Sequence, residues 1–494
     1  MNNNGYNRNN RNAPLNNNRV NNDRRYAPGR RRNTPRFPWT ALIMGILFIT
    51  AFFAVIWAIA LNGEGPSDTQ PQTTGEIQTT AEQNGTAASN DTEESTSGSE
   101  TPVFDPEAYT EMTLLATGDV MYHNPQLDAA YDYATGEYDF TNCYKYIKSI
   151  VSAADYAVAN FETTLAGTDT GYSYAGYPVF NTPDSGLSAL VDAGFDMMLF
   201  ANNHCYDTQH TGVIRTQEVF DSMGVDYIGA RKDSSGKTYR TVEVNGITLG
   251  MLNSTDDIAY GNTSPRTING ITIQSDDLPL LDIINHSLLE DFYAEAQARI
   301  SELRSSGADI IIYFIHWGNE YYLYHNDIQG QIAQRLCDMG VDVIIGSHPH
   351  VIQDAEILTS SQDPTHSTLC FYSMGNLISN QNRLTMGDTM NSTYTENGLI
   401  VELTVRKYAT GETIVTAVRT VPLWVHRYYD SAAAKMRYEI VPVDAAVAAP
   451  ASYGLYNSDF GVSHASAVSA MTNGILGGIC EAFAASVQLP TGAN

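Results

Sequence analysis

Short apolar runs rich in β-branched residues recur between residues 109 and 380, and helix-like stretches separate several of them. The apolar runs span residues 112–120, 154–162, 195–204, 308–318, 341–350 and 367–376. The helix-like stretches span residues 144–153, 185–193, 212–223, 288–305 and 328–339. Apolar runs bracketed by helices are typical of strands that are buried on both faces. The pattern therefore predicts an α/β fold built in layers.

Two stretches break this alternation and predict antiparallel hairpins. Residues 239–252 carry the turn signal Val-Asn-Gly-Ile-Thr, and residues 399–421 form a second hairpin-like stretch. The sheets are therefore expected to be mixed rather than wholly parallel. We place the main domain at residues 109–425 and a C-terminal extension at residues 426–494, which becomes rich in Ala and Gly toward its end.

The chain before the main domain contains three segments of contrasting composition. Residues 1–38 hold nine Arg and one acid among many Asn, and such a segment buries too little apolar surface to fold. Residues 39–61 are uncharged and long enough to span a bilayer, whereas a signal peptide has a shorter apolar core. Residues 62–108 form a flexible acidic linker. The Arg-rich flank predicts a single-pass protein of the cell membrane, with a cytoplasmic N-terminus and an extracellular main domain.

The net charge of the chain limits the kinds of ligand that the main domain is expected to bind. The formal net charge is −28, so without the +8 of the tail (nine Arg against Asp23) the remainder carries −36. Such an acidic domain repels a phosphate backbone, and we expect no nucleic-acid partner. An anionic substrate would need a local cationic feature, and a metal ion is one way to supply it. The five cysteines show no paired spacing, which indicates neither a disulfide framework nor a zinc ribbon.

The predicted strands end in polar side chains that are able to bind metal. These are Asp119, Asn160, Glu162, Asn202, Asn203, His204, His316, His348 and His350. In an open α/β sheet the carboxyl ends of the strands share one edge, where ligands bind. Carboxylates, amide oxygens and imidazoles together suit one or two first-row divalent ions (Mn, Zn or Fe) better than Ca²⁺ or Mg²⁺ alone.

Not every histidine belongs to this pattern. A single His after a strand is most often a hydrogen-bonded loop residue, but five strand ends that all carry potential ligands favour a metal site. His123, His210, His325 and His366 lie off these strand ends, and we expect them to be ordinary structural residues.

The motif series GDV, NFE, NNH, HWGNEY, GSHPH and YSMGN, within residues 111–380, resembles the CapA family of poly-γ-glutamate capsule biosynthesis proteins, which is related to calcineurin-like metallophosphatases. The resemblance implies a layered metallophosphatase-like β-sandwich flanked by helices, preceded by one transmembrane helix and a disordered linker. It also implies a role with an anionic surface polymer and membrane-bound polymer synthase subunits as partners.

The resemblance further implies a role for each matching residue. The implied metal ligands are Asp119, Glu162 as the bridging carboxylate, Asn203, His316, His348 and His350. His204 would act as general acid or electrostatic stabiliser, and Asn160, Asn202 and Asn376 would contact the substrate. The chain departs from the phosphatase pattern at Met121, where a His is expected. The first metal site is therefore expected to lack one ligand.

Three functions stay open at the level of the sequence. The first is synthesis, export or processing of poly-γ-glutamate or a related anionic polymer of the cell surface. The second is a metal-dependent phosphohydrolase that acts on phosphoesters of the cell envelope. The third is a non-enzymatic scaffold that binds polymer through a degenerate metal site. Because Met121 stands where the phosphatase pattern has a His, the first and third functions are favoured over a fully competent phosphatase.

Overall fold

The computed structural model describes residues 108–256, 266–455 and 459–489, all within one unit that spans residues 98–494. The basic tail, the predicted transmembrane helix and nearly all of the linker lie outside the described residues. Among the residues that are described, no single helix is long and apolar enough to cross a membrane. The helical segments Gly461–Leu476 and Ile479–Ser486 are together long and apolar enough to cross a membrane, judged by length and composition alone. They are bent by 43° relative to each other.

The first sheet has the order β19-β18-β17-β1-β4-β5-β6, with β16 paired to β1 beside this path. Its parallel strands are β1 (Tyr109–Val120), β4 (Tyr156–Phe161), β5 (Met197–Leu199), β6 (Asp226–Ile228) and β16 (Asn376–Ile378). Its antiparallel strands are β17 (Asn397–Tyr408), β18 (Thr413–Asp430) and β19 (Lys435–Pro442). The long central strand β1 therefore joins a parallel half to an antiparallel half.

The second sheet has the order β11-β8-β12-β13-β15-β14, with β7 paired to β8. Its parallel strands are β8 (Ile247–Asp256), β11 (Ile283–Ile284), β12 (Ile310–His316), β13 (Val343–Ser347) and β15 (Ser367–Phe371). Antiparallel partners are β7 (Arg240–Val244) and β14 (Ala355–Thr359). Both predicted hairpins are present, as β7–β8 and β17–β18, which confirms the prediction of mixed sheets. Two small hairpins, β2–β3 (Tyr131–Asp132, Glu137–Tyr138) and β9–β10 (Thr267–Ile268, Ile271–Thr272), lie outside the large sheets.

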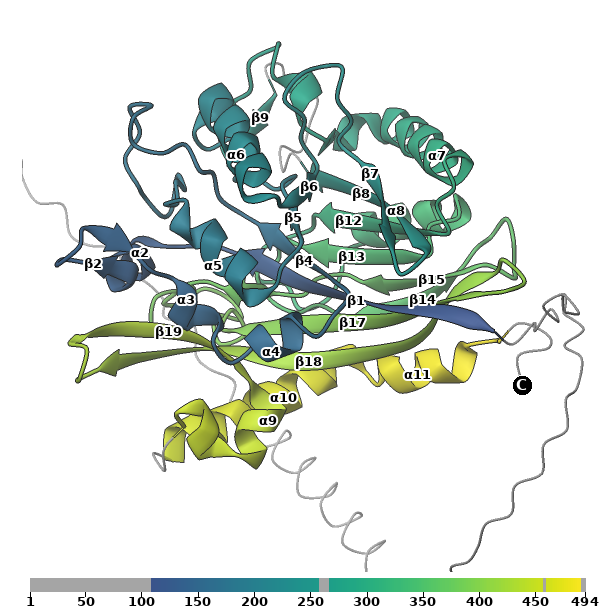
Figure 1. The fold of residues 1–494 in the computed structure, drawn as a ribbon. Coiled ribbons are helices and arrows are strands. Elements are labelled where there is room, and N and C mark those ends of the chain that lie inside the picture. The colour runs from purple at the N-terminus through teal and green to yellow at the C-terminus, as the bar shows by residue number, and fades with distance from the viewer. Residues whose placement is uncertain (1–107, 257–265, 456–458, 490–494) are drawn as a thin grey trace, which may run out of the picture. The chain divides into compact units, whose positions relative to one another are not determined.

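The two large sheets pack face to face, and helices cover their outer faces (Figure 1). Buried side chains of both sheets, such as Leu114, Val158 and Phe314, form one core between them. The outer face of the first sheet packs on α2 (Asn124–Ala130), α3 (Thr141–Tyr144), α4 (Lys148–Val151), α5 (Ser185–Ala193) and α6 (Gln209–Met223). The outer face of the second packs on α7 (Leu289–Ser305) and α8 (Asp327–Asp338). The prediction of a layered α/β fold is confirmed.

Most predicted helices begin and end where the local sequence signals place them. α8 starts at a capping box formed by Asn326 and Gln329, and α5 and α6 stop at Gly194 and Gly224 in the left-handed conformation. The single helix predicted at residues 144–153 is wrong, because α3 and α4 are two separate short helices. Neither has a side-chain cap at its first turn, and a helix this short is stable only through its packing.

The C-terminal part of the chain completes the first sheet and then covers it. β18 runs across residue 425 and β19 follows it in the same sheet. The last helices are α9 (Val443–Ala448), α10 (Asp459–Leu476) and α11 (Ile479–Ser486), with short 3-10 turns at Leu278–Leu280, His286–Leu288 and Pro450–Tyr453 elsewhere. α10 and α11 run along β18 (Figure 1), where Ile479 and Phe483 are buried. These helices thus act as a cover for the antiparallel half of the sheet.

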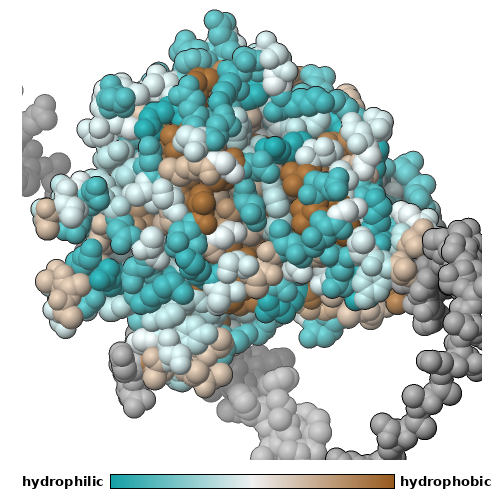
Figure 2. All heavy atoms as spheres, viewed as in Figure 1, coloured by the Kyte–Doolittle hydropathy of each residue, from teal (hydrophilic) through white to brown (hydrophobic). Residues whose placement is uncertain are grey.

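The face of the protein in Figure 2 is mostly polar, and the cysteine thiols are unpaired. On the face shown in Figure 2, hydrophilic residues predominate and apolar residues reach the surface only in small separate patches. All five cysteines are free, and burial raises the pKa of both Cys143 and Cys205 to about 12. The fold therefore depends on packing rather than on cross-links.

A close backbone contact fixes the end of β1. A Cβ atom on Gly118 would lie 1.8 Å from the carbonyl oxygen of Gly375, and the Asp119 amide donates to the same oxygen over 3.0 Å. Gly375 itself has a φ of 64°. Only glycine at position 118 lets the two segments approach this closely.

We expect Gly118→Ala to lower the free energy of unfolding by about 3 kcal/mol, because backbone atoms cannot move aside as a side chain can. Gly474→Ala is the matched control, since a Cβ there would meet nothing within 4 Å. That control should be neutral or stabilising by about 0.5 kcal/mol, as expected for Gly→Ala within a helix. Urea denaturation followed by circular dichroism measures both. Equal stability of the two variants would contradict the tight contact.

Candidate metal centre

Polar side chains from the carboxyl ends of parallel strands in both sheets meet at one edge. Each is at most 4% exposed: Asp119 in β1, Asn160 in β4, Glu162 after it, Asn202, Asn203 and His204 after β5, His316 in β12, and His348 and His350 after β13. A contact of 3.2 Å between Asn160 Nδ2 and His316 Nδ1 joins the first sheet to the second. The structure therefore gathers all nine strand-end residues that the sequence singled out.

One half of this cluster consists of Asp119, Glu162 and His350, whose ligand atoms lie close enough together to hold one metal ion. His350 Nδ1 lies 3.0 Å from Asp119 Oδ2, and His350 Nε2 lies 3.8 Å from Glu162 Oε1. Met121, at the position where a His was expected, is buried, and its amide donates to Ile378 across 2.9 Å. This half therefore offers three ligands.

The other half consists of Glu162, His316 and His348, again close enough to hold one ion. His316 Nε2 has three neighbours: Asn203 Oδ1 at 2.8 Å, His348 Nδ1 at 3.1 Å and Glu162 Oε1 at 3.5 Å. An imidazole nitrogen carries at most one hydrogen, so it cannot donate to all three. A cation at the centre of these atoms would satisfy them together.

Glu162 Oε1 belongs to both halves and has no hydrogen-bond partner among the described residues, although it is fully buried. Its other oxygen, Oε2, accepts from Asn160 Nδ2 over 3.4 Å. A buried carboxylate with one oxygen unpaired still costs free energy unless a positive charge lies beside it. Burial, and then the charge of Asp119, raises the pKa of Glu162 well above its ordinary value when no cation is present. The donor set thus fits one or two divalent ions, and Glu162 would be a ligand common to the two halves.

The histidines of the cluster differ in their tendency to take up protons. Burial and the neighbouring His348 hold the pKa of His316 well below its ordinary value, and burial lowers the pKa of His348 to about 4. Burial also lowers the pKa of His350, but the hydrogen bond and charge of Asp119 outweigh that effect and leave it raised. At neutral pH His316 and His348 are therefore in the neutral form that binds metal.

Two of these histidines have an unusual backbone conformation. His348 has a φ of 100° and His350 a φ of 56°, in the region that glycine adopts far more readily than other residues. Such conformations are seldom kept unless surrounding contacts impose them, and they concentrate at functional sites. The strained Ser-His-Pro-His turn is what directs both imidazoles toward Glu162.

The three asparagines expected to contact substrate use their amide hydrogens inside the protein. Asn160 Nδ2 donates to Asp119 Oδ1 over 2.8 Å, and Asn202 Nδ2 donates to the Phe161 carbonyl over 2.9 Å. Asn376 Nδ2 lies within 3.2 Å of three acceptors, one of them the carbonyl of His350. Their geometry suits holding the ligands in place, and contact with substrate stays a prediction.

His204 has a partner that the sequence analysis missed. Asp207 Oδ2 lies 2.7 Å from His204 Nδ1 and also accepts from the Phe180 amide. Asn269, at the turn of the β9–β10 hairpin with a φ of 47°, donates to Asp207 Oδ1 over 2.8 Å. The spacing NNHxxD and the Asn-Gly turn were the available signals. Asp207 fixes the ring so that Nε2 is the nitrogen left for other partners.

Two further residues lie near the cluster without having been predicted. His123 contacts the ring of Phe180 edge-on at 5.1 Å, and Phe180 contacts His204 in the same way at 4.7 Å. Burial, with the charges of His350 and His204, lowers the pKa of His123 to about 3. His123 therefore lies near the cluster through Phe180, and its role as an ordinary structural residue stays a prediction. Burial raises the pKa of Glu320, but the charges of His350 and His348 and a hydrogen bond with Tyr321 together outweigh this effect and leave the pKa lowered.

The three tyrosines beside the HWGNEY motif are not equivalent. Tyr321 has a φ of 68°, and its ring centre lies 6.2 Å from that of His350. Tyr322 and Tyr324 are 51% and 65% exposed. Tyr321 is thus the one of the three that borders the cluster.

Comparison with known proteins gives consistent matches. The family described as "Bacterial capsule synthesis protein PGA_cap" matches residues 113–381. The "PGA biosynthesis protein CapA" of Bacillus subtilis (strain 168) is 27% identical over 325 residues, which cover 65% of this chain and 74% of the relative. The "Capsule biosynthesis protein CapA" of Bacillus anthracis is 26% identical over 276 residues, which cover 55% and 60%.

Among solved structures, a hypothetical protein from Thermus thermophilus aligns with 63% of this chain and 98% of its own length. Its sequence identity is 15% and the TM-score is 0.35. The family match includes every residue of the cluster from Asp119 to His350.

We expect Glu162→Gln to lower the metal content of the full-length protein, purified with Mn²⁺ or Zn²⁺, by more than half, because the amide lacks the bridging charge. Glu439→Gln is the control, since this buried glutamate pairs with Lys145 over 2.6 Å instead of with imidazoles. Inductively coupled plasma mass spectrometry measures the bound metal, before and after treatment with a chelator. Unchanged metal in Glu162→Gln would exclude Glu162 as a ligand.

Proposed function

Because the chain belongs to the bacterial capsule synthesis protein family PGA_cap, we propose that it takes part in the synthesis, export or processing of poly-γ-glutamate or a related anionic polymer of the cell surface. The two CapA relatives, whose names refer to PGA and to capsule biosynthesis, support this assignment. The structural observation that supports this proposal most strongly is the Glu162 carboxylate, which belongs to both candidate metal-binding groups.

A divalent metal centre would allow this acidic protein to bind an anionic polymer. The chain carries a formal charge of −28, so a polycarboxylate meets repulsion over most of its surface. One or two ions (Mn, Zn or Fe) held by Asp119, Glu162, His316, His348 and His350, with Asn203, would provide a local positive charge. Bound there, such ions supply Lewis acidity toward an acyl or phosphoryl oxygen and lower the pKa of bound water.

The protein's own residues would handle the proton. His204, oriented by Asp207, would transfer a proton at Nε2 to or from the reacting group, as a general acid or base does. Asn160 and Asn202 would keep the ligands in place through their hydrogen bonds, and Asn376 would hold the turn that carries His350. Exclusion of water is supported by the burial of all of these side chains.

We also propose that the protein is held in the cell membrane by one helix at residues 39–61, with the N-terminus in the cytoplasm and the metal centre outside. The uncharged stretch and its Arg-rich flank support this orientation. In that place the protein would meet membrane-bound polymer synthase subunits and the growing polymer. The acidic linker at residues 62–108 would let the main domain reach both.

A second candidate is a phosphohydrolase that acts on phosphoesters of the cell envelope within a metallophosphatase-like fold. The His204–Asp207 pair favours it, because a buried carboxylate that orients an imidazole suits proton transfer to an alkoxide leaving group. The three-ligand half beside Met121 weighs against it and is compatible with a scaffold that binds polymer without catalysis.

We expect His348→Ala to abolish polymer production when the gene is returned to a capsule-forming host that lacks its own copy, because the second half-site loses a ligand. His366→Ala is the control, since His366 contacts the Val341 carbonyl before β13, at the opposite end of that strand from His348. Polymer is quantified as glutamate released by acid hydrolysis of the capsule fraction. Normal polymer with His348→Ala would refute a role for the metal centre in this process.

The phosphohydrolase alternative has its own measurement. Purified full-length protein with Mn²⁺ or Zn²⁺ is assayed on a generic phosphoester, and His204→Ala is expected to lower any activity by roughly 10²-fold. Activity that survives this substitution would argue against the role given to His204. Phosphoesterase activity that depends on His204, together with normal polymer from His348→Ala cells, would favour hydrolysis over capsule synthesis.

A further inference from the structure

Beyond the N-terminal tail, the cations of this acidic protein are concentrated in one short stretch. Of the 27 Lys and Arg residues, nine lie in the N-terminal tail, and four of the remaining 18 lie within residues 231–240. These four are Arg231, Lys232, Lys237 and Arg240, and elsewhere beyond residue 38 no separate ten-residue stretch holds more than two. The stretch connects β6 of the first large sheet to β7 of the second. The connection is therefore locally basic, although the protein as a whole is acidic.

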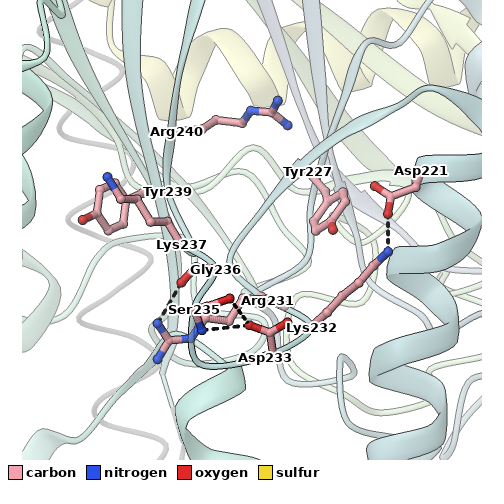
Figure 3. A pocket seen from close by; sticks show the side chains of 11 residues that line it. Asp221, Tyr227, Arg231, Lys232, Asp233, Ser235, Gly236, Lys237, Tyr239 and Arg240 are labelled. Carbon is pink, nitrogen blue, oxygen red and sulfur yellow. Dashed lines mark hydrogen bonds and ion pairs between the residues drawn. The ribbon is translucent and has the colours of Figure 1, made fainter.

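The four cations line a surface cavity of about 430 Å³ (Figure 3). Tyr227 and Tyr239 contribute aromatic walls, and the acids in the lining are Asp221 and Asp233. The cavity has the size of a typical small-ligand site. With four cations against two acids, its lining attracts anions although the protein as a whole repels them.

Arg231 presents its charge without a carboxylate among its hydrogen-bond acceptors in the described part of the chain. Its Nε donates to the Pro279 carbonyl over 2.7 Å and its Nη1 to the Gly236 carbonyl over 3.0 Å. These carbonyls hold the guanidinium in place but do not neutralise it. A planar guanidinium fixed in this way is suited to bind a carboxylate.

The two lysines are paired only at the surface. Lys232 contacts Asp221 and Lys237 contacts Glu302, and all four side chains are between 37% and 57% exposed. Exposed ion pairs contribute little free energy, so an incoming anion can take the place of the acid. Arg240 differs, because it pairs over 2.7 Å with Asp226, which also accepts from Tyr156. Arg231, Lys232 and Lys237 are therefore the cations available to a ligand.

A second cavity of about 280 Å³ continues the first. Lys237, Tyr239 and Arg240 line both of them, and the second extends to Glu302 and Ser306 near the end of α7. Two adjoining cavities that share cations fit an elongated ligand with repeated charges better than one small ion.

The stretch also begins at the edge of the sheet that carries the metal centre. β6 is parallel to β5 and pairs with it through Leu199 and Ile228, so both strands end on the same side. β5 is followed by Asn202 and Asn203, and β6 by Gly229 and the basic stretch. A Cβ on Gly229 would lie 2.4 Å from the Ala201 amide, which shows how closely the two connections approach.

We infer that the two cavities around Lys237 bind a linear polymer with a carboxylate on each repeat, as a docking site separate from the metal centre. This inference rests on the proposed function, which supplies γ-linked glutamate as the polymer. Arg231 and the two lysines bind successive carboxylates, and Tyr239 packs against the chain between them. The site would hold polymer on the surface formed by the stretch between β6 and β7 and by the end of α7.

The test uses full-length protein in detergent and a short fluorescent oligomer of γ-linked glutamate, with binding followed by anisotropy. Lys232→Ala/Lys237→Ala is expected to weaken binding by about tenfold and to flatten its dependence on salt. Lys232→Arg/Lys237→Arg keeps the charge and should retain binding. Wild-type protein that fails to bind the oligomer would overturn the inference.

The matched control removes two exposed cations elsewhere. Lys148→Ala/Arg419→Ala breaks two surface ion pairs with the same change in net charge, and it should leave the affinity within about twofold. Equal losses in the two double variants would overturn the inference, because binding would then follow overall charge. Tighter binding of linear inorganic polyphosphate than of γ-glutamate would overturn the carboxylate assignment.

Chelation separates this site from the metal centre. Binding that persists after removal of metal and is lost in the lysine variant supports the inference. Binding that is abolished by the chelator but unchanged in the lysine variant overturns it, since the oligomer then binds at the metals. Polymer yield in cells tests the proposed function independently, so either proposal can fail without the other.

Discussion

The site depends on one constraint, which is that a fully buried carboxylate must find a positive charge. Glu162 offers an oxygen to histidines from two directions, and no protein donor reaches that oxygen in the described part of the chain. A similar shortage of donors recurs at His316 Nε2, which carries at most one hydrogen and faces two acceptor oxygens and a ring nitrogen of His348. A metal ion resolves both shortages at once, whereas a proton would resolve only one of them.

Several costly features of the fold follow from this constraint. The turn after β13 keeps His348 and His350 at positive φ, and the end of β1 passes so close to Gly375 that residue 118 must be glycine. Each feature brings a ligand to the edge where the two sheets meet. A protein that did not need its ligands at this point would gain stability by relaxing both.

The sequence predicted the parts of the site that repeat along strands. Apolar runs that end in Asp119, Glu162, His316 and His350 were visible because strand ends share an edge. Asn269 was missed because it reaches Asp207 from a loop 62 residues further along the chain, whereas Asp207 lies three residues after His204 and its spacing was visible in the sequence. The sequence also does not reveal that His123 lies near the cluster, since its packing on Phe180 follows from the path of the chain after β1. The splitting of the helix at residues 144–153 likewise depends on capping and packing, which periodicity does not reveal.

The order of the strands has a consequence for when the site can exist. β1 is the first strand of the described unit, yet it lies between β4 and β17, whose residues are separated by more than half of the domain. Its pairing with β17 closes a very long loop, and such contacts form late and slowly. The ligands therefore cannot assemble until almost the whole chain has left the ribosome or any translocation channel. A metal ion that binds this cluster would then be acquired in the compartment where folding ends, and the supply there would decide which ion binds.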